Sequence, residues 1–171
     1  MFKKTMTAMG LALIVATPVA AVEGPFPVRE IDAHTDFVNA NTTALEFYPD
    51  VMTDIENAVR ARVDMADEDD VRDVGINVIL TSMRVNDTPG LTDDGEFNTL
   101  EGSIAVFDQE GQPPVFVEQV LLEATELDLP GPTIGPDDED FYTAMVLAFA
   151  DKVAEAVAEV DDLPEIEETL R

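Results

Sequence analysis

The sequence predicts an α+β fold, a two-layer sandwich in which two helices lie on one face of a mostly antiparallel sheet of about four strands. Two long segments carry apolar residues at helical spacing, and three segments between them alternate apolar and polar residues with short links. Short links favour an antiparallel meander, and two amphipathic helices can bury their apolar sides together against it. The expected order is β-α-β-β-β-α, in a single domain at 43–162.

The first 21 residues have the composition of a secretory signal peptide. Two lysines precede an apolar run at 9–16, and small residues lead up to Ala21. The apolar run is shorter than the roughly 20 residues that a membrane-spanning helix needs. We therefore expect cleavage after Ala21 and a periplasmic or secreted mature protein that begins at Val22.

The segment before the first helix is expected to be extended. Residues 22–42 form a lead-in with prolines, a glycine and no clear period, and residues 43–48 form a short strand. Pro49 favours this interpretation, because it pushes the preceding residue toward extended geometry and suits the first turn of a helix. The alternative is a helix that begins at Thr43, with Thr43 and Glu46 as a capping box and a kink at Pro49.

The first helix is predicted from Pro49 to about residue 65. Its apolar residues recur at three- and four-residue spacing and form one stripe: Val51, Met52, Ile55, Ala58, Val59 and Val63. Asp50 and Asp54 lie near its N-terminus, where the helix dipole favours negative charge. Ile55 lies in the middle of the stripe, so we expect its side chain to be buried.

Three strands are predicted at 74–85, 97–108 and 115–124, with turn residues at 86–90 and 109–113. The first strand alternates between two sets, which we expect on opposite faces: Ile76, Val78 and Leu80 on one, and Asn77, Ile79, Thr81 and Met83 on the other. The second strand alternates in the same way. Together the three strands form the expected meander.

The second helix follows a turn-rich crossing at 129–136 and begins after the acids of 137–140. Its apolar residues again recur at helical spacing over about five turns: Phe141, Met145, Ala148, Phe149, Val153, Ala156, Val157 and Val160. Phe149 lies mid-stripe and is expected in the core. The last residues, 163–171, are expected to be a charged tail.

The chain is strongly acidic and has no cysteine. It has 9 basic and 37 acidic residues, a formal net charge of −28, and loss of the two lysines at 1–21 leaves 7 against 37, a net charge of −30. This charge repels nucleic acid and anionic lipid headgroups, so we expect neither as a partner, and it is typical of adaptation to a salty medium. Without cysteine there are no disulfides or thiolate metal sites, and we expect no lipid anchor.

No catalytic constellation stands out. His34 is the only histidine and lies near Asp32 and Asp36, an arrangement that could orient a general base or a metal ligand. No second histidine or cysteine exists to complete a zinc or nucleophilic site, so we interpret His34 as a solvated surface residue. Ser82 and Ser103 lack the surroundings of a nucleophile elbow. We therefore expect no enzymatic activity.

Acid clusters at 64–73, 92–96 and 137–140 suggest calcium, which binds six to eight oxygen ligands. The candidate metal ligands are Asp93, Asp94 and Glu96. None of the clusters has the spaced Asp-x-Asp-x-Asp-Gly pattern of a calcium loop. A solvated loop, a hairpin tip and a helix N-terminus explain them better than a calcium site does, so we expect no cofactor and keep calcium as the alternative.

The face of the predicted sheet away from the helices carries more apolar residues than a solvent face needs. Ile79, Met83 and Phe107 are the candidate partner-binding residues, with Leu121 beside them. The alternative is that the lead-in, or the loop at 125–136, covers this face.

The helix at 54–63 before the sheet and the alanine-rich helix at 149–157 after it enclose the three-stranded meander. Over about 43–160 this order resembles the compact domain of bacterial envelope-assembly factors. Examples are the N-terminal domain of the translocation protein TolB, the lipopolysaccharide-assembly lipoprotein LptE and auxiliary lipoproteins of ABC-type transport systems. The chain departs from the lipoproteins because it has no cysteine for lipidation.

These observations favour a non-catalytic, soluble binding or assembly module of the bacterial envelope, salt-adapted and periplasmic or secreted. An envelope or secreted protein is the expected partner. The first alternative is a calcium-responsive acidic binding protein. The second is a hydrolase of unknown type.

Overall fold

The computed structural model describes residues 26–37, 43–67, 72–108, 111–124, 134–136, 138 and 140–160. The elements are β1 (Val28–Thr35), α1 (Thr43–Phe47), α2 (Val51–Arg60), β2 (Val74–Arg84), β3 (Thr99–Phe107), β4 (Phe116–Glu123) and α3 (Phe141–Ala158). The predicted signal peptide and charged tail lie outside the described residues. No described helix is long and apolar enough to cross a membrane.

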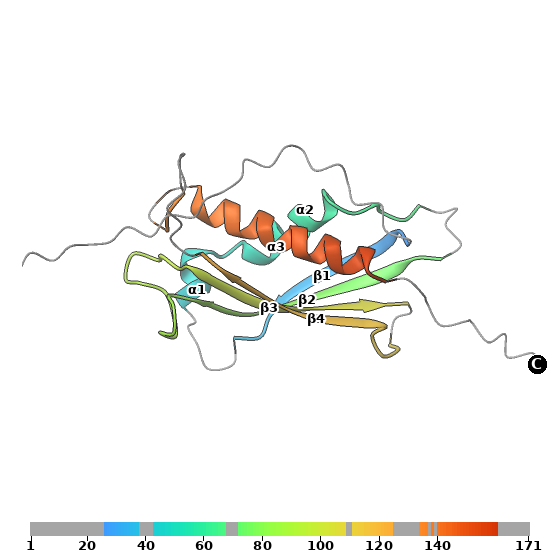
Figure 1. The fold of residues 1–171 in the computed structure, drawn as a ribbon, viewed down its shortest axis with the longest axis horizontal. Coiled ribbons are helices and arrows are strands. Elements are labelled where there is room, and N and C mark those ends of the chain that lie inside the picture. Colours follow the sequence, from blue (N-terminus) through green and yellow to red (C-terminus); the bar gives the residue numbers. More distant parts are fainter. Residues whose placement is uncertain are drawn as a thin grey trace, which may run out of the picture.

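The four strands form one sheet in the order β1-β2-β3-β4. β1 runs parallel to β2, whereas β2, β3 and β4 form an antiparallel meander. Figure 1 shows α2 and α3 on the same side of this sheet; α2 contacts β1, and α3 contacts β3 and β4. The predicted two-layer α+β sandwich with a mostly antiparallel sheet is confirmed.

The first strand is not where we expected it. Residues 43–48 were expected as a strand, but Thr43–Phe47 is the helix α1, and the strand is β1, within the expected lead-in. The Tyr48 N–H donates to the Ala44 carbonyl (2.8 Å), which completes the last turn of α1. The helix therefore continues to Phe47 and ends shortly before Pro49. The alternative of a helix that begins at Thr43 and is interrupted at Pro49 is the correct one, and its capping box of Thr43 and Glu46 stays a prediction.

A register irregularity explains why the alternation of β1 was missed. Its pairing with β2 shifts between Val28 and Glu30, so the buried positions are Val28, then Ile31 and Ala33. The extra residue, Arg29, interrupts the period of two on which strand prediction depends. From Glu30 onward β1 alternates regularly between exposed and buried side chains.

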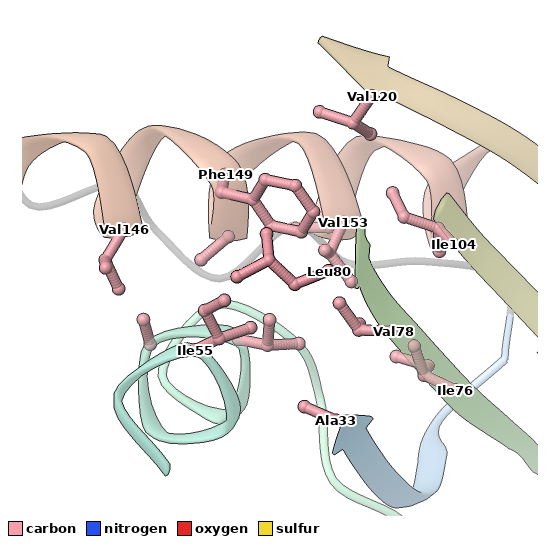
Figure 2. Packing of buried hydrophobic residues seen from close by; sticks show 14 of the residues in the cluster. Ala33, Ile55, Ile76, Val78, Leu80, Ile104, Val120, Val146, Phe149 and Val153 are labelled. Atoms are coloured by element: carbon pink, nitrogen blue, oxygen red, sulfur yellow. The ribbon is translucent and has the colours of Figure 1, made fainter. Parts of the chain in front are cut away.

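The core lies between the helices and the sheet, and both predicted helical stripes supply it. Ile55 and Phe149 are fully buried, as predicted from their places in the stripes. Figure 2 shows Phe149 and Val153 from α3 pointing toward Leu80 of β2, with Ile55 of α2 beside them. The helix α2 ends at Arg60, several residues before the predicted end.

The core face of β3 has a glycine, Gly102, against the ring of Phe149 of α3. A Cβ atom on Gly102 would lie 2.7 Å from the Ile79 carbonyl oxygen and 3.0 Å from Cζ of Phe149. The ring of Phe149 therefore occupies the space that a side chain at position 102 would need. This contact fixes how closely α3 packs on the sheet.

Met83 lies on the opposite face from the one we expected. Leu80 pairs with Gly102 and Ser82 pairs with Glu101, so Thr81 is an extra residue in β2. The bulge reverses the alternation beyond it, since one inserted residue turns every later side chain to the other face. Met83 consequently pairs with Leu100 and is only 2% exposed, in the core.

Candidate functional site

The candidate functional site is the face of the sheet that points away from α2 and α3, which we call the outer face (Figure 1). Paired residues on neighbouring strands point to the same side, so the strand register defines its members. They include Glu30, Asp32 and His34 of β1; Gly75, Asn77, Ile79 and Ser82 of β2; Glu101, Ser103, Ala105 and Phe107 of β3; and Val117, Gln119 and Leu121 of β4.

An open cavity of about 470 Å³ lies on the outer face across β1, β2 and β3. Its lining is Arg29, Glu30, Asp32, Gly75, Ile76, Asn77, Phe107 and Gly111. Gly75 pairs with both Glu30 and Phe107, so these three residues form one row across the sheet. Gly75 has no side chain, and the side chains of Arg29 and Glu30 lie over it: a Cβ atom there would lie 3.3 Å from Nη2 of Arg29 and 3.3 Å from Oε1 of Glu30.

The polar groups of the cavity are mainly hydrogen-bond acceptors. The Arg29 guanidinium is already bound by the Asp73 carboxylate and lies 3.7 Å from the carboxylate of Glu30. Asp32 makes no ion pair within the described part of the chain. The Oδ1 atom of Asn77 is buried without a hydrogen-bond partner there. The groups that can still bind a ligand, the Asp32 carboxylate and the Asn77 Oδ1 atom, are hydrogen-bond acceptors. They therefore suit a ligand that is positively charged and donates hydrogen bonds.

Two of the three predicted partner-binding residues lie on the outer face. Ile79 and Phe107 are both half-buried there, whereas Met83 lies in the core. Ile79 pairs with Ser103, two rows along the strand from Phe107, so the two side chains do not form one continuous patch. The most exposed apolar side chains of this face are on β4, where Val117 and Leu121 are each 57% exposed.

His34 is exposed on the outer face, where it pairs with Ile79. Asp32 lies two residues before it, on the same face of the strand. Ser82 and Ser103 are half-buried residues of β2 and β3. The described residues thus bring no histidine, serine and carboxylate together by hydrogen bonding into a nucleophilic site.

The calcium candidates lie in the connection between β2 and β3. Asp93 and Asp94 are exposed at a tight turn, in which Gly95 has a φ of +85° and donates its N–H to the Thr92 carbonyl (3.0 Å). The Glu96 N–H donates to the Thr92 side chain (2.9 Å). No group of three or more ligating side chains that could hold a metal occurs in the described ranges. Calcium binding stays a prediction.

An aromatic cluster at one end of the molecule was not predicted. Tyr48 and Tyr142 stack with ring centroids 4.5 Å apart, and Phe97 contacts Tyr48 and Phe141 edge to face at 5.5 Å. The Tyr48 hydroxyl donates to the Gly95 carbonyl (2.9 Å). The cluster joins the residue after α1, the β2–β3 connection and the start of α3. These segments are far apart in sequence, so no local pattern indicates the contact.

Both phenols of the cluster are held in the neutral form. Burial raises the pKa of Tyr142, and the hydrogen bond that its hydroxyl donates to Asp54 (2.6 Å) raises it further. Burial, and then the charge of Glu96, raise the pKa of Tyr48. Neutral, hydrogen-bonded phenols suit a structural role in joining these segments.

No protein-family model matches this chain, and no curated protein matches it. It is similar to a PelC dodecamer from Paraburkholderia phytofirmans, with 14% identity, coverage of 80% of this chain and 92% of that chain, and a TM-score of 0.41. It is also similar to uncharacterized lipoprotein B from Nitrosomonas europaea, with 14% identity, 86% and 90% coverage and a TM-score of 0.31. A third structure, of an uncharacterized protein, has 16% identity, 81% and 93% coverage and a TM-score of 0.26.

Proposed function

We propose that this chain is a non-catalytic binding module, periplasmic or secreted, that binds a cationic segment of a partner protein on its outer face. The observation that carries the proposal is the cavity between Glu30, Asp32 and Phe107, on the side of the sheet away from the helices. The signal-peptide pattern at 1–21 supports the compartment.

The chemistry of the cavity indicates the charge of the ligand. Two carboxylates, Glu30 and Asp32, lie at its wall. Glu30 and Asp73 both contact its one basic residue, Arg29, whereas Asp32 has no ion pair among the described residues. A guanidinium or ammonium group would pair with a carboxylate and could also lie against the ring of Phe107, a contact worth about 0.5–2 kcal/mol. The net charge of −28 would speed the approach of such a segment at low salt.

A peptide titration tests this proposal. The probe is a synthetic peptide that alternates arginine and leucine, and the backbone amide signals of the exported chain are followed by NMR. Signals of Asp32, Asn77 and Phe107 are expected to move. The double variant Glu30→Gln, Asp32→Asn should weaken binding about tenfold, which corresponds to about 1.4 kcal/mol.

A matched control separates specific binding from attraction to an acidic surface. The double variant Asp93→Asn, Asp94→Asn also removes two negative charges, but from the exposed β2–β3 connection. It should therefore change the affinity less than about twofold. Phe107→Ala should weaken binding while the melting temperature changes little. Equal losses in the two double variants would contradict the proposal.

A further inference from the structure

The two edges of the sheet differ in how they are protected. At the β1 edge, the Val28 N–H donates to the Asp64 carbonyl (2.7 Å), and the Ala66 N–H donates to the Val28 carbonyl (2.8 Å). Farther along β1, the Ala33 N–H donates to the Glu56 carboxylate of α2 (3.3 Å). Residues after and within α2 therefore cover the backbone groups of this edge.

The edge at β4 has no such cover among the described residues. β4 pairs only with β3, over eight residues, Phe116–Glu123. It has no proline, no lysine and no register shift, three devices by which natural sheets prevent pairing between edges. The helix α3 contacts both β3 and β4, so it lies over these strands on the core side. The edge is thus suited to accept another strand.

The hydrogen-bond pattern shows which residues of β4 point their backbone groups outward. The Ala124 N–H donates to the Asn98 carbonyl (2.8 Å), and antiparallel pairs alternate in their bonding. Even-numbered residues of β4 therefore bond to β3. Val117, Gln119 and Leu121 direct their N–H and C=O groups to the free edge, and their side chains lie on the outer face.

We infer that β4 pairs antiparallel with β4 of a second copy of this chain, centred on Gln119. The two four-stranded sheets become one sheet of eight strands about a two-fold axis. In this register Gln119 lies opposite Gln119 of the partner subunit. Val117 then lies opposite Leu121 of the partner subunit, so each exposed apolar side chain gains an apolar neighbour.

The sequence of β4 favours a second copy as the occupant. Its apolar outer-face residues, Val117 and Leu121, are equally distant from Gln119, so antiparallel self-pairing about Gln119 sets each opposite the other. Centring the pair on Glu118 would instead place two carboxylates directly opposite each other, which is unfavourable. The register centred on Gln119 avoids any acid–acid pair and forms two apolar pairs, each worth about 0.2–1 kcal/mol.

The one charge on the inner side of this strand, that of Glu118, acts on Lys152 of the same subunit. Glu118 points to the core side of β4, toward α3. The hydrogen bond to Glu155 raises the pKa of Lys152, and the charge of Glu118 raises it as well. The net charge of −28 on each copy still opposes association, so the dimer should be favoured by salt, which screens this repulsion.

Cysteine cross-linking tests both the dimer and its register, because the chain has no cysteine of its own. Gln119→Cys places two thiols at a hydrogen-bonded antiparallel pair, where Cα atoms are about 5.5 Å apart, within the range of a disulfide. We expect this variant to form a covalent dimer on mild oxidation. Asp94→Cys, at an exposed turn, is the control for random collisions and should cross-link at least about tenfold more slowly.

A mixing experiment defines the register. Val117→Cys alone should not cross-link, because its thiols would lie about four residues, or roughly 14 Å, apart. An equimolar mixture of Val117→Cys and Leu121→Cys should give mainly the mixed dimer. Dimerisation of Leu121→Cys with itself at the rate of Gln119→Cys would overturn the register.

The unmodified chain supplies the independent measurement. Sedimentation equilibrium at high salt should show a dimer, whereas Leu121→Pro should be a monomer with an unchanged circular dichroism spectrum. The proline removes only an N–H that points to the free edge, so the pairing with β3 is kept. A monomeric unmodified chain, or equal cross-linking of Gln119→Cys and Asp94→Cys, would overturn the proposal. Neither result bears on the cationic peptide titration.

Discussion

At the scale of single residues, the tyrosine pair shows how half-buried hydroxyl groups find hydrogen-bond partners. The two rings are nearly parallel, with an interplanar angle of 8°, and each hydroxyl donates one hydrogen bond. The acceptors are the Gly95 carbonyl for Tyr48 and the Asp54 carboxylate for Tyr142. A buried hydroxyl without a partner would cost about 1–3 kcal/mol, so both bonds contribute to stability.

The raised pKa of Tyr142 predicts a loss of stability at alkaline pH. Below a pH of about 10 both the folded and the unfolded chain keep the phenol proton, and above it the unfolded chain releases the proton first. The folded state then binds more protons, so the free energy of unfolding falls as the pH rises. Denaturant titrations across this range should show a shallower fall for Tyr142→Phe than for the unmodified chain.

The chain has two tyrosines, so tyrosinate absorbance reports this pair alone. The folded protein should develop little tyrosinate signal until the pH is well above 10. Tyr48→Phe keeps the Tyr142 hydrogen bond to Asp54 and serves as the control for loss of a hydroxyl. Ionisation of both phenols near their ordinary pKa in the folded protein would contradict the expected effect.

At the scale of elements, periodicity predicted most of the fold and failed where one residue interrupts it. The stripes that contain Ile55 and Phe149 are buried, because each helix presents a single apolar side. Because of the register shift after Val28, the sequence of β1 does not alternate in the way that predicts a strand. Because of the bulge at Thr81, the side chain of Met83 points into the core. Both irregularities depend on pairing with another strand, so the sequence of the strand alone does not reveal them.

Removing the Phe149 ring should have a large effect on stability. Phe149→Ala is expected to lower the free energy of unfolding by about 2–5 kcal/mol, because the ring fills the space over Gly102 and is fully buried. Denaturant titration measures this. Leu121→Ala, at a 57% exposed position, is the comparison and should cost under about 1 kcal/mol in the monomer. Similar losses in both variants would contradict the packing described for α3.

The position of the candidate site could be predicted only in part, because it depends both on the alternation within each strand and on which strands pair. The alternation of β2 and β3 correctly placed Ile79 and Phe107 on the outer face. The cavity could not be anticipated, because it needs Arg29 and Asp32, which lie in a segment whose alternation is interrupted. Its location depends on β1 pairing with a strand that follows long after it in the sequence.

At the scale of the whole molecule, acidic residues greatly outnumber the basic residues that could pair with them. The ion pairs in the described segments already engage most of the arginines, as in the contacts of Arg62 with Asp151 and of Arg72 with Asp108 (3.4 Å). With 37 acidic and 9 basic residues in the chain, most carboxylates have no basic residue of their own to pair with. Their mutual repulsion destabilises the compact state.

The thermal stability of the chain should therefore rise with ionic strength. Salt at about 0.1–0.15 M screens charges beyond roughly 8–10 Å, which weakens the repulsion among surface carboxylates. Melting curves over a series of sodium chloride concentrations measure the effect, with potassium chloride as a control for a specific ion. A midpoint that stays constant or falls with salt would show that the carboxylates are neutralised locally.

The parallel pairing of β1 with β2 also has a consequence for how the chain folds. The connections from β2 to β3 and from β3 to β4 are shorter than the one from β1 to β2, which contains both α1 and α2. Pairing of β1 with β2 therefore closes a longer loop than either pairing within the meander. Contacts that close long loops form late, so we expect β1 to add to a preformed meander. Pulsed hydrogen exchange during refolding should protect the amides of β3 before those of β1. Until that last strand adds, β2 is itself an open edge, and the folding chain is then most exposed to faulty pairing with other chains.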